Sequence, residues 1–155
     1  MWTIIIIRQI WRMIFYLSNA TMVDMKTYDY YSALVKPFFS PPAWVFGPVW
    51  TVLYILIIIS YGYAGYLFFT KKIPLIVILP FILNLIFNLS FTYIQFGLKN
   101  NILASIDILL VLGTLIWALI AIYPYVSWIT YINIPYVLWG SFATVLQLTI
   151  TWLNR

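Results

Sequence analysis

The stretch of sequence that decides the fold is residues 37–70, which read PFFSPPAWVFGPVWTVLYILIIISYGYAGYLFFT and contain no Asp, Glu, Lys or Arg. About 20 apolar residues are enough for a helix to cross a bilayer. Two more charge-free runs follow, over residues 73–98 and 108–154, and the last is long enough for two crossings. These runs exclude a water-soluble domain and predict a membrane protein.

The overall composition supports the same class. Of the 155 residues, 65% are hydrophobic, 21% are aromatic and only 7% are charged. The alternation of apolar and polar residues that marks outer-membrane barrel strands is scarce. We therefore expect the fold class to be all-α, an integral membrane bundle of five transmembrane helices that forms a single domain over residues 1–155.

Prolines, charges and turn residues divide the chain into the expected spans. Pro41 and Pro42 suit a helix start, because proline fits the first turn, where its missing N–H has no partner in any case. Lys71-Lys72 and residues 97–101 mark short turns, and Pro135 is expected to kink the last span. The expected spans are about 2–22, 43–69, 74–96, 102–122 and 127–153, with a long loop over 24–42.

The first expected span carries Arg8 and Arg12, which lie four residues apart and so on one helical face. A guanidinium group at the bilayer centre costs about 3 kcal/mol on insertion scales. We therefore expect both side chains to reach the interface or to pair with an acid.

Several kinds of chemistry are excluded by what the sequence lacks. It has no His and no Cys, so zinc sites, thiol redox couples and His-based acid/base catalysis cannot be built, and no metal site is expected. The net charge is +5, but the basic residues are scattered singly or in one pair. This pattern indicates contact with lipid headgroups of the bilayer and no nucleic-acid partner.

A polar stripe marks the third expected span. Its members recur at spacings of four, four and three residues and therefore share one helical face: Asn84, Asn88, Thr92 and Gln95. One interpretation is hydrogen bonding that joins neighbouring helices, worth around 1 kcal/mol or less per bond. The other is the wall of a pocket, and the stripe alone favours neither.

Asp107 is the one acidic residue inside an expected span. An intramembrane carboxylate is by default a functional hypothesis. Its position near the start of a helix also favours a structural role, because the helix dipole stabilises negative charge there. Both interpretations stay open.

Two tryptophans differ from those expected at the membrane interface. Trp50 and Trp139 each lie inside a helix with a tyrosine at helical spacing, Tyr54 and Tyr136 respectively. Two indoles at similar depth predict a site that holds a flat apolar ligand between them.

The region around Trp50 resembles a known family signature. It reads Tyr31-x-x-Leu34-x-Lys36-Pro37-x-x-x-Pro41-Pro42-x-Trp44-Val45-Phe46-Gly47-Pro48-Val49-Trp50-x-x-Leu53-Tyr54. This pattern is similar to that of the tryptophan-rich sensory protein / translocator protein (TspO/MBR, peripheral-type benzodiazepine receptor) family, and the chain resembles a bacterial-type member. The resemblance continues through Asn84, Asp107 and Pro135-Tyr136-x-x-Trp139-x-x-Phe142-Ala143.

The resemblance implies a pocket for porphyrins such as protoporphyrin IX or haem, with no required cofactor. It implies these ligand-binding residues: Tyr31, Trp50, Asn84, Asn88, Trp139 and Ala143. It also implies that the proline-rich loop forms a lid, with these residues: Lys36, Pro37, Pro41, Pro42 and Trp44.

Three functions remain open at this stage. The first is a multi-pass protein of a bacterial cell membrane that binds porphyrin-like ligands and transports or senses them. The second is a light-dependent porphyrin-degrading enzyme that uses Trp50 and Trp139, and the third is a ligand-free membrane scaffold. A homodimer is permitted by the small residues spaced four apart at Ser60/Ala64 and Gly140/Thr144.

Overall fold

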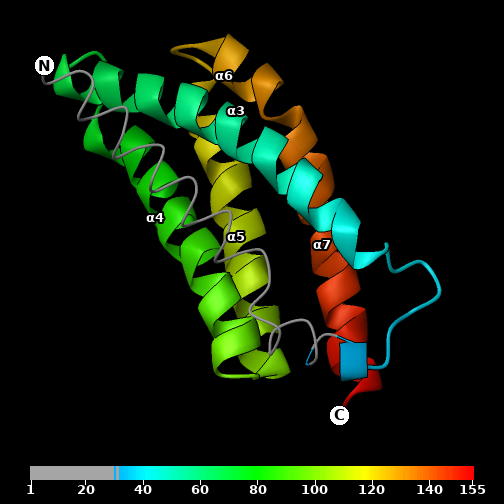
Figure 1. Ribbon diagram of the computed structural model, residues 1–155. Helices are drawn as coiled ribbons and strands as arrows, with labels where there is room; N and C mark the ends of the chain where they lie inside the picture. The colour runs from blue at the N-terminus through cyan, green and yellow to red at the C-terminus, as the bar shows by residue number, and fades with distance from the viewer. Residues whose placement is uncertain (1–29, 31) are drawn as a thin grey trace, which may run out of the picture.

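The structure, a computed structural model, describes residue 30 and residues 32–155, and the regular structure in this part of the chain is helical, without strands (Figure 1). From residue 43 onward, five α-helices and one π-helical segment follow one another. They are α3 (Ala43–Phe69), α4 (Leu75–Thr92), η1 (Tyr93–Gly97), α5 (Asn101–Ile122), α6 (Ser127–Ile132) and α7 (Ile134–Leu153).

Four membrane-spanning helices are present in the described part of the chain. They are α3, α4 continued by η1, α5 and α7, and each is long and apolar enough to cross a bilayer. The chain is therefore a multi-pass integral membrane protein. The first expected span, over about 2–22, lies outside the described residues, and so do Arg8 and Arg12.

The start and end of α3 follow from its sequence. It begins at Ala43, directly after the proline pair. It ends in a Schellman motif, in which the Lys72 N–H donates to Leu67 O over 2.8 Å and the Lys71 N–H donates to Phe68 O over 2.9 Å. Lys71 takes the left-handed conformation, with φ 58°, that this motif requires.

The last expected span is interrupted. The short helix α6 ends at Ile132, and α7 begins at Ile134, so the break falls at Asn133, two residues before Pro135. Proline fits best in the first turn of a helix, where its missing N–H has no partner in any case, and Pro135 lies in the first turn of α7.

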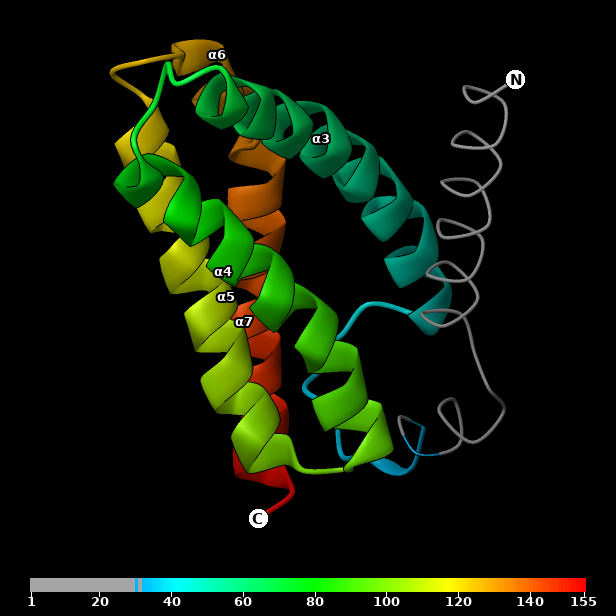
Figure 2. The ribbon, with the colours of Figure 1, turned by 90° about the vertical axis from the view of Figure 1, so that its left-hand side faces the viewer.

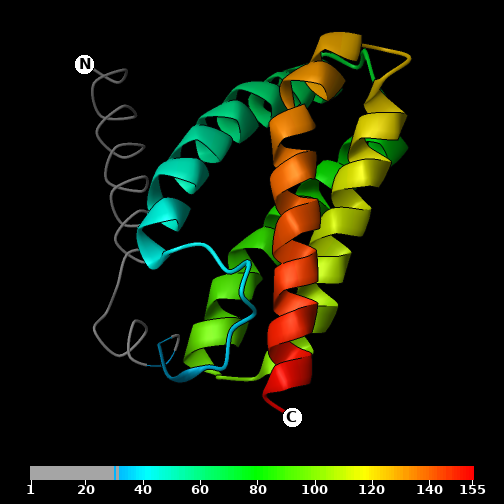
Figure 3. The ribbon, with the colours of Figure 1, turned by 90° about the vertical axis from the view of Figure 1, so that its right-hand side faces the viewer.

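The helices pack unequally around α5. Half of the membrane-spanning stretch of α5 is buried, but only 17% of that of α3. Figures 2 and 3 show α4, α5 and α7 side by side, whereas α3 meets them near α6 and diverges toward its own N-terminus. The N-terminal half of α3 is therefore the loosely packed part of the described bundle.

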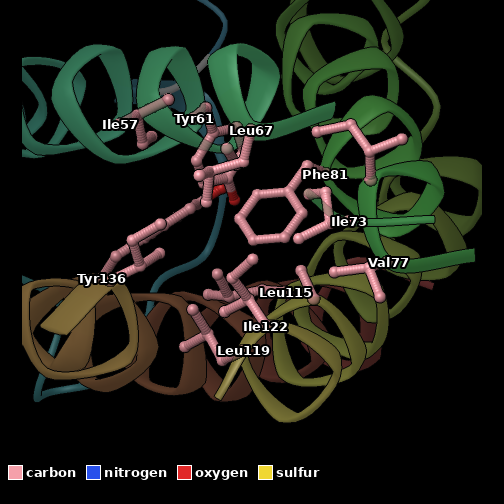
Figure 4. Packing of buried hydrophobic residues seen from close by; sticks show 14 of the residues in the cluster. Ile57, Tyr61, Leu67, Ile73, Val77, Phe81, Leu115, Leu119, Ile122 and Tyr136 are labelled. Carbon is pink, nitrogen blue, oxygen red and sulfur yellow. The ribbon is translucent and has the colours of Figure 1, made fainter. Parts of the chain in front are cut away.

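The hydrophobic core lies at the α6 end of the bundle (Figure 4). Tyr61 of α3 packs edge-on against Phe81 of α4, with ring centroids 4.8 Å apart. Leu115 of α5 and Tyr136 of α7 are also fully buried in this cluster. The same four helices thus form a filled core at one end.

The small residues considered for a dimer contact lie inside the chain. Ser60, Ala64, Gly140 and Thr144 are all buried. The nearest side-chain atom to a Cβ built on Gly140 belongs to Leu112 of α5. These positions let helices of the same chain approach one another, and they present little surface to a second copy.

Candidate functional site

A cavity of about 160 Å³ lies in the other half of the bundle and adjoins the core cluster, with which it shares Tyr136. Its walls come from the N-terminal half of α3, the end of α4 with η1, the first half of α5, and α7. The lining residues are Phe46, Trp50, Tyr54, Asn88, Phe91, Thr92, Gln95, Phe96, Ile108, Val111, Tyr136, Trp139, Gly140, Ala143, Leu146, Gln147 and Ile150.

Aromatic rings form the wall between α3 and α7. The ring of Trp50 lies 5.4 Å from that of Tyr54 and 6.4 Å from that of Tyr136. The indole of Trp139 lies 5.7 Å from the ring of Phe46. Such rings present broad apolar faces, the surface on which a flat ligand stacks.

The polar stripe of α4 joins the helices at Asn84 and contributes to the cavity wall at Asn88. Asn84 is completely buried and is not among the lining residues. Its Nδ2 donates to Val111 O over 2.8 Å, and its Oδ1 accepts hydrogen bonds from the hydroxyls of Tyr61 at 2.8 Å and Tyr136 at 3.2 Å. The amide is fully engaged in joining four helices, and the structure places it behind the cavity lining.

Asn88, one turn further along α4, does line the cavity. Its Nδ2 donates to the Tyr136 hydroxyl over 2.8 Å, and its Oδ1 accepts from the Tyr54 hydroxyl at 3.3 Å. Two tyrosines that line the cavity are thus held in place by one asparagine.

The end of the cavity nearest the chain's C-terminus is polar but uncharged. Gln147 donates from Nε2 to Gln95 Oε1 over 3.0 Å, and Gln95 donates from Nε2 to Asn101 Oδ1 over 3.2 Å. The π-helical segment η1 places Gln95 here, with its side chain almost completely buried. Irregular π turns of this kind are frequent at functional sites.

The sequence patterns did not assign Gln147 to the site. A usable signal was available, because Gln147 lies four residues after Ala143 and eight after Trp139 and so shares their helical face. Tyr54 and Tyr136, expected only as neighbours of the tryptophans, are lining residues themselves.

Two polar atoms near the cavity are buried without a hydrogen-bond partner among the described residues. One is Nε1 of Trp139, a lining residue, and the other is Oδ2 of Asp107, which does not line the cavity. A buried polar atom left unpaired costs about 1–3 kcal/mol. No cluster of metal-ligating side chains occurs in the described part of the chain.

The structure brings together four of the six predicted ligand-binding residues. Trp50, Asn88, Trp139 and Ala143 line the cavity. Asn84 lies behind the wall, and Tyr31 lies outside the described residues.

The predicted lid residues lie apart from the cavity lining. Lys36, Pro37, Pro41, Pro42 and Trp44 are all absent from it, and Trp44 is 72% exposed.

The proline-rich loop is tied to the C-terminal end of α7. The Val35 N–H donates to Asn154 Oδ1 over 3.0 Å, and Asn154 Nδ2 donates back to Val35 O over 2.9 Å. Further along, Phe39 packs edge-on against Phe142 of α7, with centroids 6.4 Å apart. These contacts hold the loop beside α7, at the cavity end of the bundle.

Comparison with known proteins gives a consistent family assignment. The model of the TspO/MBR family matches residues 3–153. The chain is 37% identical to the tryptophan-rich protein TspO of Bacillus cereus over 143 residues, which cover 91% of this chain and 90% of that protein. It is 33% identical to the human translocator protein over 127 residues, covering 76% and 70% of the two chains. Protein CrtK of Rhodobacter capsulatus is 28% identical over 138 residues, covering 88% and 86%.

Proposed function

The chain belongs to the TspO/MBR family, and we propose that it binds porphyrin-type ligands, such as protoporphyrin IX, in the cavity between α3 and α7. The observation that carries the proposal is the pair of indoles, Trp50 and Trp139, that line one cavity with a polar end. Stacking on aromatic faces supplies most of the affinity, and a few polar groups fix the orientation.

The polar end of the cavity, formed by the amides of Gln95 and Gln147, suits the carboxylates of a porphyrin. Gln95 and Gln147 offer neutral donors and acceptors, and none of the described residues that line the cavity is charged. A porphyrin has a flat apolar ring with carboxylates on one edge, so the ring faces Trp50 and Trp139 and the carboxylates face the glutamines. Because the chain has no His or Cys, the site recognises the ring and offers neither common side-chain ligand to the iron of haem.

The cavity has to widen for such a ligand. Its volume of about 160 Å³ is below the ~300–1,000 Å³ of sites that hold drug-sized molecules. The N-terminal half of α3 is the loosely packed wall, so we propose that it moves outward when the ligand binds. This half also contains Pro48, which removes one backbone hydrogen bond from the helix.

The names of the relatives suggest a role beyond binding itself. Some are called translocator proteins and one is called a tryptophan-rich sensory protein. We propose that this chain likewise passes its ligand on or reports its presence, in a bacterial cell membrane. Either role needs the same reversible binding step.

Binding is tested by titrating protoporphyrin IX into the protein reconstituted in lipid nanodiscs and following tryptophan fluorescence in the dark. We expect quenching that saturates at one porphyrin per cavity. Empty nanodiscs control for partitioning into lipid. Quenching that rises linearly without saturation would contradict the proposal and favour the ligand-free scaffold.

A second candidate function is light-driven breakdown of the bound porphyrin. It is favoured by the two oxidisable indoles at the cavity, one with an unpaired N–H. The variant Trp139→Phe keeps an aromatic face, so dark affinity should fall by only ~1 kcal/mol. Light-dependent loss of porphyrin absorbance should fall much further, and equal loss in wild type, variant and protein-free nanodiscs would exclude the enzyme.

A further inference from the structure

An apolar groove runs along the outer surface between α3 and α7, on the other side of the cavity wall. Pro48, Val52 and Leu53 line it from α3, and Leu138, Trp139 and Phe142 line it from α7. These residues belong to membrane-spanning helices, so the groove lies on the membrane-facing surface of the part of the chain that the structure describes. Among the described residues, Trp139 alone lines both this groove and the cavity.

Neighbouring residues along α7 alternate between the two spaces. Leu138 faces the groove and Gly140 faces the cavity, while Phe142 faces the groove and Ala143 faces the cavity. The wall that separates the groove from the cavity is therefore about one side chain thick at Trp139.

Few interactions hold the wall between the groove and the cavity closed, so opening it costs little free energy. The backbones of α3 and α7 hardly approach each other, and the two helices meet through rings such as Phe46 and Trp139, 5.7 Å apart. The indole N–H of Trp139 has no hydrogen-bond partner among the described residues, so rotating this side chain breaks no such bond there. Pro48 and Pro135, one on each helix, both lie along the groove, and proline is the usual site of helix bending.

We propose that the groove and the cavity are one lateral passage from the bilayer, closed by the indole of Trp139. The proposal rests on the proposed function, because the molecule that passes is the porphyrin that the cavity binds. The class of molecule it admits is flat, apolar and dissolved in the membrane, with a hydrogen-bond acceptor such as a carboxylate. The acceptor gives the unpaired N–H of Trp139 a partner as the molecule passes.

A passage affects rates and leaves the equilibrium unchanged, which gives a sharp test. Leu138 lines the groove without lining the cavity, so Leu138→Trp fills the passage from the lipid side. The matched control is Ile120→Trp on α5, because Ile120 is 68% exposed and Leu138 is 67% exposed, and both lie toward the α6 end of their helices.

Binding and release are measured by stopped-flow fluorescence of protoporphyrin IX exchanged between labelled lipid vesicles and nanodiscs that hold the protein. We expect Leu138→Trp to slow both rates by about tenfold, the scale of overpacking effects, with their ratio unchanged. Ile120→Trp should exchange like the wild type. Unchanged rates in Leu138→Trp, or a change in affinity alone, would overturn the passage.

A second variant guards against misfolding of the first. The natural chain has no cysteine, so Val52→Cys with Leu138→Cys can be joined across the groove by a reversible bifunctional thiol reagent. Exchange should stop in the cross-linked protein and return on reduction; exchange that continues at the wild-type rate would overturn the passage. Failure of the proposed function looks different, because the wild type itself would then show no saturable binding.

Discussion

The two halves of the bundle use the same helices and similar side chains, yet one is filled and the other is hollow. At the α6 end, Tyr61, Phe81 and Leu115 pack into a core in which they are almost completely buried. At the other end, Trp50 and Trp139 surround a cavity of about 160 Å³. Apolar composition alone therefore does not decide whether a region packs into a filled core or encloses a cavity.

The difference is clearest at two asparagines one turn apart on α4. Asn84 bonds to two tyrosines and a backbone carbonyl inside the core, whereas Asn88 holds two tyrosines at the cavity wall. In a membrane the cost of an unsatisfied amide is similar at both positions, so the neighbours decide its role. We expect changes near Asn84 to affect folding and changes near Asn88 to affect binding.

The largest expected effect comes from filling the hollow half. Ala143→Phe places a ring in the cavity, so protoporphyrin affinity should fall by at least about 100-fold, or ~2.7 kcal/mol. The free energy of unfolding should change little, because the ring occupies empty space. Affinity is measured by fluorescence titration and stability by denaturation in mixed micelles.

The control for this variant is Val145→Phe, because Val145 lies on the same helix and is 56% exposed. It should bind like the wild type. Near-normal affinity in Ala143→Phe would place the ligand elsewhere.

A comparable change in the filled half should act on stability instead. Asn84→Leu removes the acceptor of the Tyr61 and Tyr136 hydroxyls, and we expect a loss of about 2 kcal/mol in unfolding free energy. Porphyrin affinity of the folded protein should stay close to normal. Adding Tyr61→Phe removes the hydroxyl that Asn84→Leu leaves unpaired. The double variant should therefore lose less unfolding free energy than the sum of the two single losses. Strictly additive losses would show that the hydrogen bond from Tyr61 to Asn84 contributes nothing.

The polar end of the cavity gives a smaller effect. Gln147→Leu removes an amide that faces the proposed carboxylate position, and we expect an affinity loss of ~1 kcal/mol for protoporphyrin IX. The dimethyl ester, which has no charged carboxylates, is the matched ligand and should lose less. Equal losses for both ligands would show that Gln147 acts through packing.

The smallest effect is expected at Asp107. Asn has nearly the same shape and no charge, so Asp107→Asn should change the unfolding free energy by less than about 1 kcal/mol. Binding should be unchanged, because Asp107 does not line the cavity. A large loss of binding in this variant would favour the functional interpretation of the carboxylate over the structural one.

The sequence predicted the helical class well, because charge-free runs and prolines mark the ends of spans. The break at Asn133, near Pro135, and the start of α3 after Pro42 follow from proline's missing N–H. The cavity could not be predicted from the sequence. Helical periodicity shows which residues share a helix face, but it does not give the distance to the neighbouring helix.

Because the sequence does not show which helix a face contacts, it also could not assign a partner to the small residues or to the polar stripe. Close spacing of Gly140 and Thr144 indicates a helix contact, but the partner here is a helix of the same chain. The stripe indicated that α4 has a polar face, and only the positions of Tyr61 and Tyr136 show that Asn84 belongs to the core.

The most direct test of the account is an experimental structure of the protein with protoporphyrin IX bound. We predict density for the ring between Trp50 and Trp139, its carboxylates toward Gln95 and Gln147, and the N-terminal half of α3 displaced outward. The hydrogen bond from Tyr61 to Asn84 should be unchanged. Porphyrin density only on the outer surface, or inside a disrupted core around Phe81, would contradict the division of the bundle into a filled half and a binding half.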